Sequence, residues 1–289
     1  MSEMYFSQYK LNFNDELDNQ YENIEVNYKT QTSLYVGFGM SFYRFGFAFS
    51  YRLPYTNIPD LKKEQAFSFS GGYSYKHFYG ELKIKKYQGV QEEIIRYDND
   101  TTITTIIVNQ GIETRQVGLN LYYFSSDKYN FDANFKNYNT QKKTATSFIL
   151  GGGLNYYNFS GELDLNLKQE IAPNYKKDID VKTIKFMPGI ATSLVYNNFY
   201  FSTMTLMGGA YNYNTLDYNE IRHNFSPIVE LRAVLGYNNR NLFTSINLNY
   251  DYDLVFLRQN KLGVHNFMVN MKLGIKLNSK YLGKIGRYL

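Results

Sequence analysis

The sequence predicts an all-β protein: a single closed antiparallel up-and-down transmembrane β-barrel of about 14 strands, with 12 or 16 as the alternative counts. Apolar and polar residues alternate along most of the chain, as they do when one sheet face meets lipid and the other a polar lumen. No run approaches the roughly 18 consecutive apolar residues of a membrane helix, so a membrane-spanning protein would need strands closed into a barrel. Short turns flanked by aromatic residues alternate with longer, more polar connections, a pattern typical of short periplasmic turns and long extracellular loops. The turns are predicted at 43–46, 75–78, 123–129, 156–159, 196–199 and 237–242.

The composition fits one large domain over residues 1–289. Tyr (30) and Phe (22) are abundant, yet hydrophobic residues make up only 44% of the chain and the mean hydropathy is −0.44. No Pro/Gly/Ser-rich linker divides the chain, so we expect one outer-membrane β-barrel domain with strands over about 4–277 and a basic C-terminal tail at 278–289. Cysteine is absent, which excludes disulfides and thiolate metal sites. The net charge of +5 is scattered and forms no basic stripe, so we expect no nucleic-acid partner.

Four segments separate their two faces most cleanly: 45–53, 159–168, 242–252 and 267–277. In the first, every second residue is aromatic or Leu, and Gly, Ala, Ser and Arg lie between them. Each pattern has the period of two that a pleated strand requires. The remaining strands are predicted near 4–13, 34–43, 65–76, 78–90, 112–124, 129–139, 145–157, 184–196, 199–213 and 224–237.

This strand order places both chain termini on the periplasmic side. Long outer connections are expected at 14–33, 91–111 and 169–183. Pro188 and Pro227 cannot donate to a strand ladder, so we expect them near the outer rim and not at the membrane midplane.

Charged residues on the predicted inner face are the candidate functional groups. They could line a polar path and set selectivity for a solute. Alternatively, opposite charges on neighbouring strands could pair across the interior and close it. Because the signs are mixed, the sequence favours a plugged or narrow lumen over an open pore. The lumen-lining candidates are Arg52, Glu81, Lys83, Lys85, Asp132, Lys136, Glu162, Asp164, Lys168, Glu230, Arg232, Asp251, Lys272 and Lys276.

No motif predicts catalysis, a cofactor or a metal site. His77, His223 and His265 have no spacing typical of a metal site and no Cys partner. The glycine runs lack the Gly-Lys-Ser/Thr sequence of a phosphate-binding loop, and no Gly-x-Ser-x-Gly elbow occurs. We therefore expect a protein that is not an enzyme and has no catalytic, cofactor-binding or metal-binding residues.

Two stretches carry a resemblance to a known family. Residues 28–39, followed by 44–51, and then residues 62–67 with 80–89 resemble an uncharacterised family of Bacteroidota outer-membrane β-barrel proteins, a domain of unknown function of about this length. The resemblance implies an outer-membrane location in a Gram-negative cell. It implies no catalytic or ligand-binding residues.

Three functional hypotheses follow. The first is an integral outer-membrane barrel, porin-like, that binds or transports small solutes through a polar, narrow or plugged lumen. The second is a non-catalytic scaffold barrel that binds envelope proteins through its long loops, and the third is a soluble all-β carbohydrate-binding protein. Expected partners are outer-membrane lipid, a small solute and envelope proteins. The start of the sequence (residues 1–4) has no basic and apolar leader, so we expect a form whose signal peptide is absent.

Overall fold

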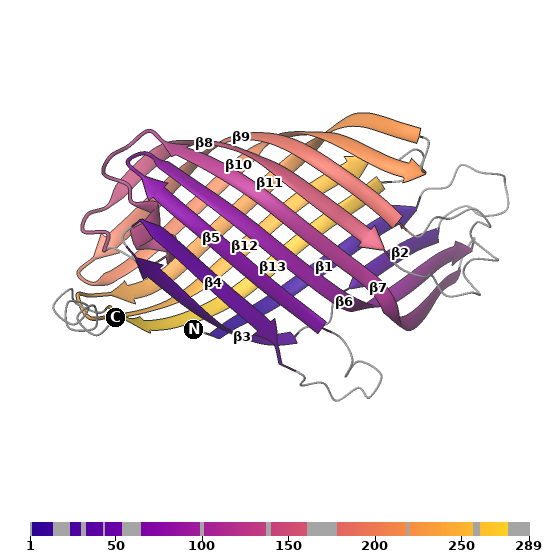
Figure 1. Ribbon diagram of the computed structural model, residues 1–289, viewed down its shortest axis with the longest axis horizontal. Coiled ribbons are helices and arrows are strands. Elements are labelled where there is room, and N and C mark those ends of the chain that lie inside the picture. The colour runs from indigo at the N-terminus through magenta and orange to yellow at the C-terminus, as the bar shows by residue number, and fades with distance from the viewer. Residues whose placement is uncertain are drawn as a thin grey trace, which may run out of the picture.

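The computed structural model shows thirteen antiparallel strands in one strongly curled sheet (Figure 1). It describes residues 2–13, 24–29, 33–42, 44–53, 65–98, 101–136, 140–160, 178–217, 220–256 and 261–276. Within these ranges, none of the helical segments has the length and apolarity needed to cross a membrane. The all-β, antiparallel, up-and-down architecture predicted from the alternation is confirmed.

The strands are short near the N-terminus and long from β6 onward. One short π-helical turn, η2 (Asp132–Lys136), lies between β7 and β8. The strands are β1 (Ser2–Phe13), β2 (Ile24–Lys29), β3 (Ser33–Phe42), β4 (Phe45–Arg52), β5 (Gln65–Tyr75), β6 (Phe78–Asp98), β7 (Thr101–Phe124), β8 (Ala145–Ser160), β9 (Asp178–Tyr196), β10 (Phe199–Asp217), β11 (Glu220–Asn238), β12 (Leu242–Phe256) and β13 (Lys261–Ile275).

The strand pairing returns from the last strand to the first. From β3 to β13 each strand pairs with the next one along the chain. β13 then pairs with β1, from Ser2 opposite Met271 to Asn12 opposite Lys261. On its other side, β1 pairs with β3 near its start and with β2 near its end.

β2 and β3 together make one pass of the chain along β1. Gln8 lies opposite Lys29 of β2, whereas Tyr5 lies opposite Ser33 of β3, so the register shifts by one residue between the two pairings. The thirteen strands therefore make twelve passes instead of the predicted 14. Because β4 and β5 are short, β2 pairs directly with β6 beyond them.

The predicted strand 129–139 is wrong. Its aromatic alternation resembles a strand, but the described part forms a helical turn at 131–136. The Asn130 side chain accepts a hydrogen bond from the Ala133 N–H (2.9 Å). The Gln141 side chain accepts one from the Asn130 N–H (3.0 Å) and donates to the Lys128 carbonyl (2.8 Å). These local bonds between side chains and backbone offer the chain an alternative to a strand ladder.

The predicted turn at 156–159 is also wrong, because β8 continues through it. Tyr156 pairs with Val117 of β7 and with Lys182 of β9. The Tyr156 hydroxyl donates to Asp180 Oδ1 (2.6 Å), and the Asn158 amide donates to the same atom (2.9 Å), so side chains of β8 and β9 meet where a turn was expected. Of the strand predicted at 159–168, residues 159–160 are instead the end of β8. Residues 161–168 lie outside the described residues.

Four of the other predicted turns, at 43–46, 75–78, 196–199 and 237–242, join consecutive strands at the end of the sheet where β1 begins and β13 ends, which we call the turn end. The fifth, 123–129, lies at the same end but is the start of the longer β7–β8 connection and not a tight turn. Lys76 and Asn197 have left-handed backbones (φ 51° and 55°), as tight connections between strands require. At the opposite end, the loop end, the connection predicted at 91–111 is instead the tip of a long β6–β7 hairpin. The long N-terminal connection contains β2, and the range 169–183 is described only from Asp178, in β9.

The two prolines do not share one location. Pro227 lies in the outer part of β11, where the ladder with β12 has already ended. Pro188 lies opposite Leu150 near the middle of β9, so its predicted rim position is wrong. The β9–β10 ladder skips the neighbouring residues, from Leu206 opposite Gly189 to Gly209 opposite Phe186, which accommodates a residue without an N–H.

Candidate functional site

The interior of the curled sheet is occupied at the turn end by the β7–β8 connection. We call this connection the plug: residues 125–144, of which 125–136 and 140–144 are described. Phe131 is at its centre, with ring centroids 4.2 Å from Tyr79, 5.1 Å from Phe135 and 5.6 Å from Phe124. These aromatic rings pack on a buried inner patch that we call the apolar wall, formed by Ile149, Met187, Leu206, Ile228 and Val234 of β8–β11.

Hydrogen bonds fix the position of the plug. Asn134 is fully buried, and its Oδ1 accepts from Ser193 Oγ of β9 (3.0 Å). Lys272 of β13 donates to the Phe135 carbonyl (3.3 Å). Lys276, just beyond β13, donates to Thr140 Oγ1 (3.1 Å). The plug is thus joined to opposite sides of the sheet.

Asp132 of the plug faces a cavity of about 420 Å³ at the turn end. Its carboxylate accepts a hydrogen bond from Ser74 Oγ (2.6 Å). Burial raises the pKa of Asp132 above its ordinary value, and the Ser74 hydrogen bond and the charge of Lys136 offset only part of that effect. A partly buried carboxyl therefore lies where the plug meets β5.

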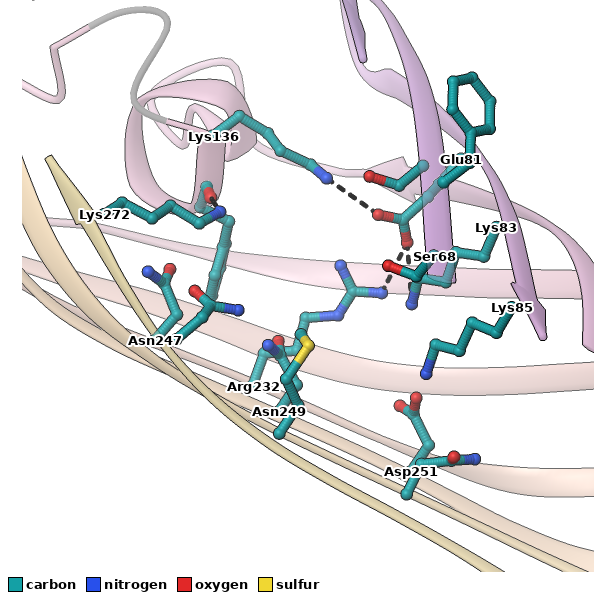
Figure 2. Close-up of a pocket in the computed structure, with 16 residues that line it drawn as sticks. Ser68, Glu81, Lys83, Lys85, Lys136, Arg232, Asn247, Asn249, Asp251 and Lys272 are labelled. Carbon is teal, nitrogen blue, oxygen red and sulfur yellow. Dashed lines mark hydrogen bonds and ion pairs between the residues drawn. The ribbon is translucent and has the colours of Figure 1, made fainter. Parts of the chain in front are cut away.

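A buried carboxylate joins the plug to the strands of the curled sheet. Glu81 of β6, 2% exposed, contacts Lys136 Nζ of the plug (2.9 Å), Lys83 Nζ (3.1 Å) and Arg232 Nη2 of β11 (3.0 Å) (Figure 2). One anion is therefore shared by three cations from three separate elements. Such a cluster persists in a low-dielectric interior only if its members stay paired.

Arg232 is held in turn by a second carboxylate. Its Nε donates to Glu230 Oε1 (2.7 Å), and its Nη2 donates to the Tyr122 hydroxyl (2.9 Å). Tyr122 is fully buried and donates to Glu230 (2.9 Å). Its ring and that of Phe131 also lie close to the guanidinium, at 5.3 and 5.7 Å.

A cavity of about 80 Å³ lies between the plug and the strands opposite the apolar wall. Charged side chains from β6, η2, β11, β12 and β13 surround it (Figure 2). We call its strand side the polar wall: Ser68, Ser70, Lys83, Lys85, Asn247, Asn249, Asp251, Asn266, Asn270 and Lys272.

Beyond the cavity, toward the loop end, the interior is filled by a second polar layer. Gln116 and Asn155 both donate to the Tyr157 hydroxyl (3.2 Å each), and that hydroxyl donates to Asp253. On the neighbouring strands, Thr183 donates to Asn212 (2.7 Å), and other buried polar groups continue this layer. Side chains of the plug and of this polar layer thus lie on either side of the cavity.

The outer face of the sheet is apolar over a continuous band. Phe148, Ile184 and Leu235 are 71%, 57% and 57% exposed, respectively, and their neighbours along each strand are buried. Tyr123, Tyr196 and Tyr237 border the band at the turn end, and Tyr211, Tyr213, Tyr250 and Tyr252 border it near the loop end. Among the described side chains of β3–β13, no outward position between these borders carries a charge.

The height of this band can be estimated from β10. About twelve residue steps separate Phe199 from Tyr211. At a rise of about 3.4 Å per residue and the tilt of about 35–45° that is typical of transmembrane barrels, such a segment would span roughly 30 Å along a barrel axis. Beyond this border the outward residues become charged, as in the Lys86–Glu113 ion pair (2.8 Å).

Most of the predicted lumen residues lie either on the inner side of the strands or on the plug. Eight lie on the inner side of strands: Arg52, Glu81, Lys83, Lys85, Glu230, Arg232, Asp251 and Lys272. Asp132 and Lys136 lie on the plug and not on a strand, which corrects their expected location, and Lys276 contacts the plug from the end of β13. Glu162, Asp164 and Lys168 lie outside the described residues.

Several residues of the site were missed because they carry no charge. Asn247 and Asn249 lie in the inward phase of a cleanly alternating strand, so their position was predictable and only their role was not. Phe131 and Phe135 gave no usable signal, because their spacing also fits a strand. Within the described part of the chain, no group of three His, Asp or Glu side chains is arranged to hold a metal ion.

Comparison with known proteins identifies a family and finds weak similarity to two solved structures. No curated protein matches the chain significantly. Among solved structures, the chain is similar to one described as a porin refined at 1.8 Å resolution (10% identity, 88% of this chain, TM-score 0.26). It is also similar to a bacterial polysaccharide outer membrane secretin (9% identity, 93% of this chain and 98% of that chain, TM-score 0.23). The chain spans only 64% of the length of the porin.

The family model covers almost the whole chain. A model described as "Domain of unknown function (DUF4421)" matches residues 3–276, from the second residue of β1 to the end of β13. The resemblance to an uncharacterised family is thereby confirmed, whereas the Bacteroidota origin remains a prediction. The protein belongs to the DUF4421 family.

Proposed function

We propose that this protein is an integral outer-membrane β-barrel. The observation that carries the proposal is the uncharged outward band, which has the height of a bilayer core and aromatic borders on both sides. A soluble protein would need a second layer to cover side chains as exposed as Phe148 (71%) and Ile275 (71%). The returning β13–β1 pairing supports a closed cylinder, which hydrocarbon requires because it cannot satisfy a free strand edge.

Within this barrel, the polar interior binds or passes small solutes without catalysis. The plug contacts the apolar wall closely, so the route for a solute runs along the polar wall, past Lys272 and Lys83. Because the cavity on this route is only about 80 Å³, the resting lumen is narrow. Passage of anything larger than a hydrated ion requires the plug to move.

Conductance in planar lipid bilayers tests this function. We expect the wild-type protein to give small, infrequent openings and the Phe131→Ala variant to open more often, because that ring is the centre of the plug. Phe148→Ala, which shortens an outward ring on β8, is the matched control and should conduct like wild type. Folded wild-type and Phe131→Ala proteins that neither conduct nor take up solute would eliminate the passage function.

A scaffold function is the second candidate, and one observation favours it. The β6–β7 hairpin remains paired as far as Asp98 opposite Thr101, well beyond the tyrosine border, and so projects past the apolar band (Figure 1). Among the described residues, β7 is paired only with β6 over residues 101–109, so its other edge can pair with a strand of another envelope protein. Co-purification from gently solubilised membranes should then depend on residues 91–108, and a barrel isolated without companions would contradict the scaffold function.

A further inference from the structure

The outer face of β8–β10 is hollowed within the apolar band. The hollow has a volume of about 650 Å³, and we call it the outer groove: Phe148, Leu150, Pro188, Gly189, Ile190 and Met207. We propose that the outer groove binds one anionic phospholipid of the leaflet at the turn end, with an acyl chain in the groove and the phosphate beside three lysines of the plug. The inference rests on the proposed function for the placement of the barrel in a bilayer and does not involve the lumen.

The outer groove forms where the β9–β10 ladder is interrupted. The ladder skips two residues beside Pro188, and neither Pro188 nor Gly189 has a long side chain that could fill the gap. The exposed side chains of Phe148 on β8 and Met207 on β10 border it. Its volume lies in the range of about 300–1,000 Å³ that is usual for ligand pockets. An apolar lining in this position suits hydrocarbon and not a soluble ion.

Three lysines of the plug lie close together at the turn end of the same strands. Lys128, Lys142 and Lys143 are all exposed, and the last two directly precede β8. The Gln141 amide nitrogen donates to the carbonyls of both Lys128 and Lys143 (2.8 Å each). A single amide therefore holds the first and last parts of the plug against each other, and with them the three lysines, which we call the lysine cluster.

The plug is also attached to the wall of the outer groove. The Ser125 N–H donates to the Phe148 carbonyl (3.0 Å), and the Phe148 N–H donates to Ser125 Oγ (3.1 Å). Ser125 itself lines the groove and is three residues before Lys128. The lysine cluster and the groove are therefore fixed relative to each other.

The described carboxylates at the turn end have other contacts. The lysine cluster forms no ion pair within the described part of the chain. Asp127 contacts His77 Nε2 of the β5–β6 turn (3.8 Å). Asp132 accepts the hydrogen bond from Ser74 and faces the cavity of the turn end. The cluster thus keeps its positive charge.

The segments without a described structure do not change this balance. Residues 137–139, which complete the plug, are Asn, Tyr and Asn, and residues 277–289 contain no Asp or Glu. Glu3, near the start of β1, is several strands away from β8 in the sheet. The positive charge of the lysine cluster therefore follows from the sequence as well as from the described contacts.

The outer face changes along β8 and β9 in the order in which a phospholipid changes. Lys143 comes first, then Thr146 and Thr192, whose hydroxyls are 3.3 Å apart, and then Phe148 and Ile190 in the groove. A phospholipid has a phosphate, then ester groups that accept hydrogen bonds, then acyl chains. The five residue steps from Lys143 to Phe148 correspond to roughly 17 Å along the strand, and flexible lysine stems can cover part of that distance.

The charge of the lysine cluster selects the lipid. Each lysine near a bilayer surface contributes about 1 kcal/mol to the attraction of anionic lipids. A neutral phospholipid can fill the groove but gains nothing from the cluster, so the two lipid classes should differ here. A protein partner would have to insert a membrane-spanning segment to reach the groove, whereas lipid already surrounds it.

Single-tryptophan fluorescence tests the proposal, because the chain contains no tryptophan. Phe148→Trp places the reporter in the outer groove, and the matched Leu235→Trp places it on the outer face of β11, five residues from the exposed Arg240 but outside the groove. In phosphatidylcholine vesicles, brominated phosphatidylglycerol is compared with brominated phosphatidylcholine as the quencher.

We expect half-maximal quenching at 148 to require about 5- to 10-fold less phosphatidylglycerol than phosphatidylcholine, and a difference below about 2-fold at 235. Equal quenching at 148 by the two lipids would overturn the proposal.

Charge variants separate a defined site from general surface charge. In the Phe148→Trp protein, Lys142→Gln combined with Lys143→Gln should abolish the preference for phosphatidylglycerol. Lys76→Gln combined with Arg240→Gln removes the same net charge from two other turns of the turn end and should leave the preference intact. Equal losses in the two double variants would contradict a site at the lysine cluster.

The reporter at 235 distinguishes this inference from the proposed function. Quenching at 235 by both lipids without a lipid preference at 148 would remove the lipid site and leave the membrane-spanning barrel in place. A lack of quenching at 235 by either lipid would remove the membrane placement, and the lipid site with it.

Discussion

The two walls of the interior contrast sharply although they belong to one sheet. The apolar wall of β8–β11 contributes Ile149, Met187 and Leu206 to an apolar contact with the plug. The polar wall of β5, β6, β12 and β13 contributes lysines, serines and asparagines to a cavity. The contrast indicates how the plug can occupy the interior of the curled sheet without filling it: apolar packing holds the plug on one side, and charged and polar groups surround a cavity on the other.

Glu81 is the point where the two regions meet, and its removal should have the largest effect. Glu81→Gln leaves Lys136, Lys83 and Arg232 without their shared carboxylate. We expect the free energy of unfolding to fall by about 3–5 kcal/mol, because the remaining buried cations lose their partner. Urea unfolding of the detergent-folded barrel measures it. Glu113→Gln, which breaks an ion pair on the outer face, should cost no more than about 1 kcal/mol, and equal losses would refute the special role of Glu81.

Phe131→Ala tests the apolar side of the contrast. The variant loses ring contacts with Tyr79, Phe135 and Phe124, and we expect a loss of about 3 kcal/mol, at the low end for a buried Phe because the plug can partly readjust. The same unfolding assay reports it. If Phe131→Ala and the outward Phe148→Ala destabilise equally, the plug is not packed as described.

Asp132 provides a smaller, pH-dependent test. Its raised pKa means that the folded state binds a proton more tightly than the unfolded chain, so stability should decline as the pH rises from the ordinary pKa of an aspartate through the raised value. Stability measured across this acidic range should fall less in Asp132→Asn, which cannot titrate at this position. Parallel curves for the two proteins would show that the carboxyl is not buried against Ser74.

The fold was predictable where local pattern decides the structure. Alternation gave the correct inward and outward faces of β4, β12 and β13, because a strand with one apolar face has only one favourable phase. It failed at residues 129–139, where Asn130 and Gln141 form local hydrogen bonds and tertiary packing buries consecutive residues. The direct pairing of β2 with β6 depends on the lengths of β4 and β5 and has no local signal.

The candidate site was predictable as a set of residues but not as a geometry. Glu81, Lys83 and Arg232 were all expected to face inward, and they do. Their convergence depends on which strands face each other across the interior, which the phase of a single strand does not reveal. Lys136 reaches the same cluster from a turn that the alternation assigned to a strand.

Lipid quenching along one outward strand face tests the transmembrane placement most directly. Ile190 and Lys182 both lie on the outer face of β9, the first within the apolar band and the second at its border, and each is replaced by Cys in a separate variant. With a fluorescent thiol label in reconstituted bilayers, brominated acyl chains should quench the label at 190 strongly and the label at 182 weakly, whereas aqueous iodide should show the reverse order. Strong iodide quenching at 190 with no effect of brominated lipid would contradict the membrane-spanning barrel.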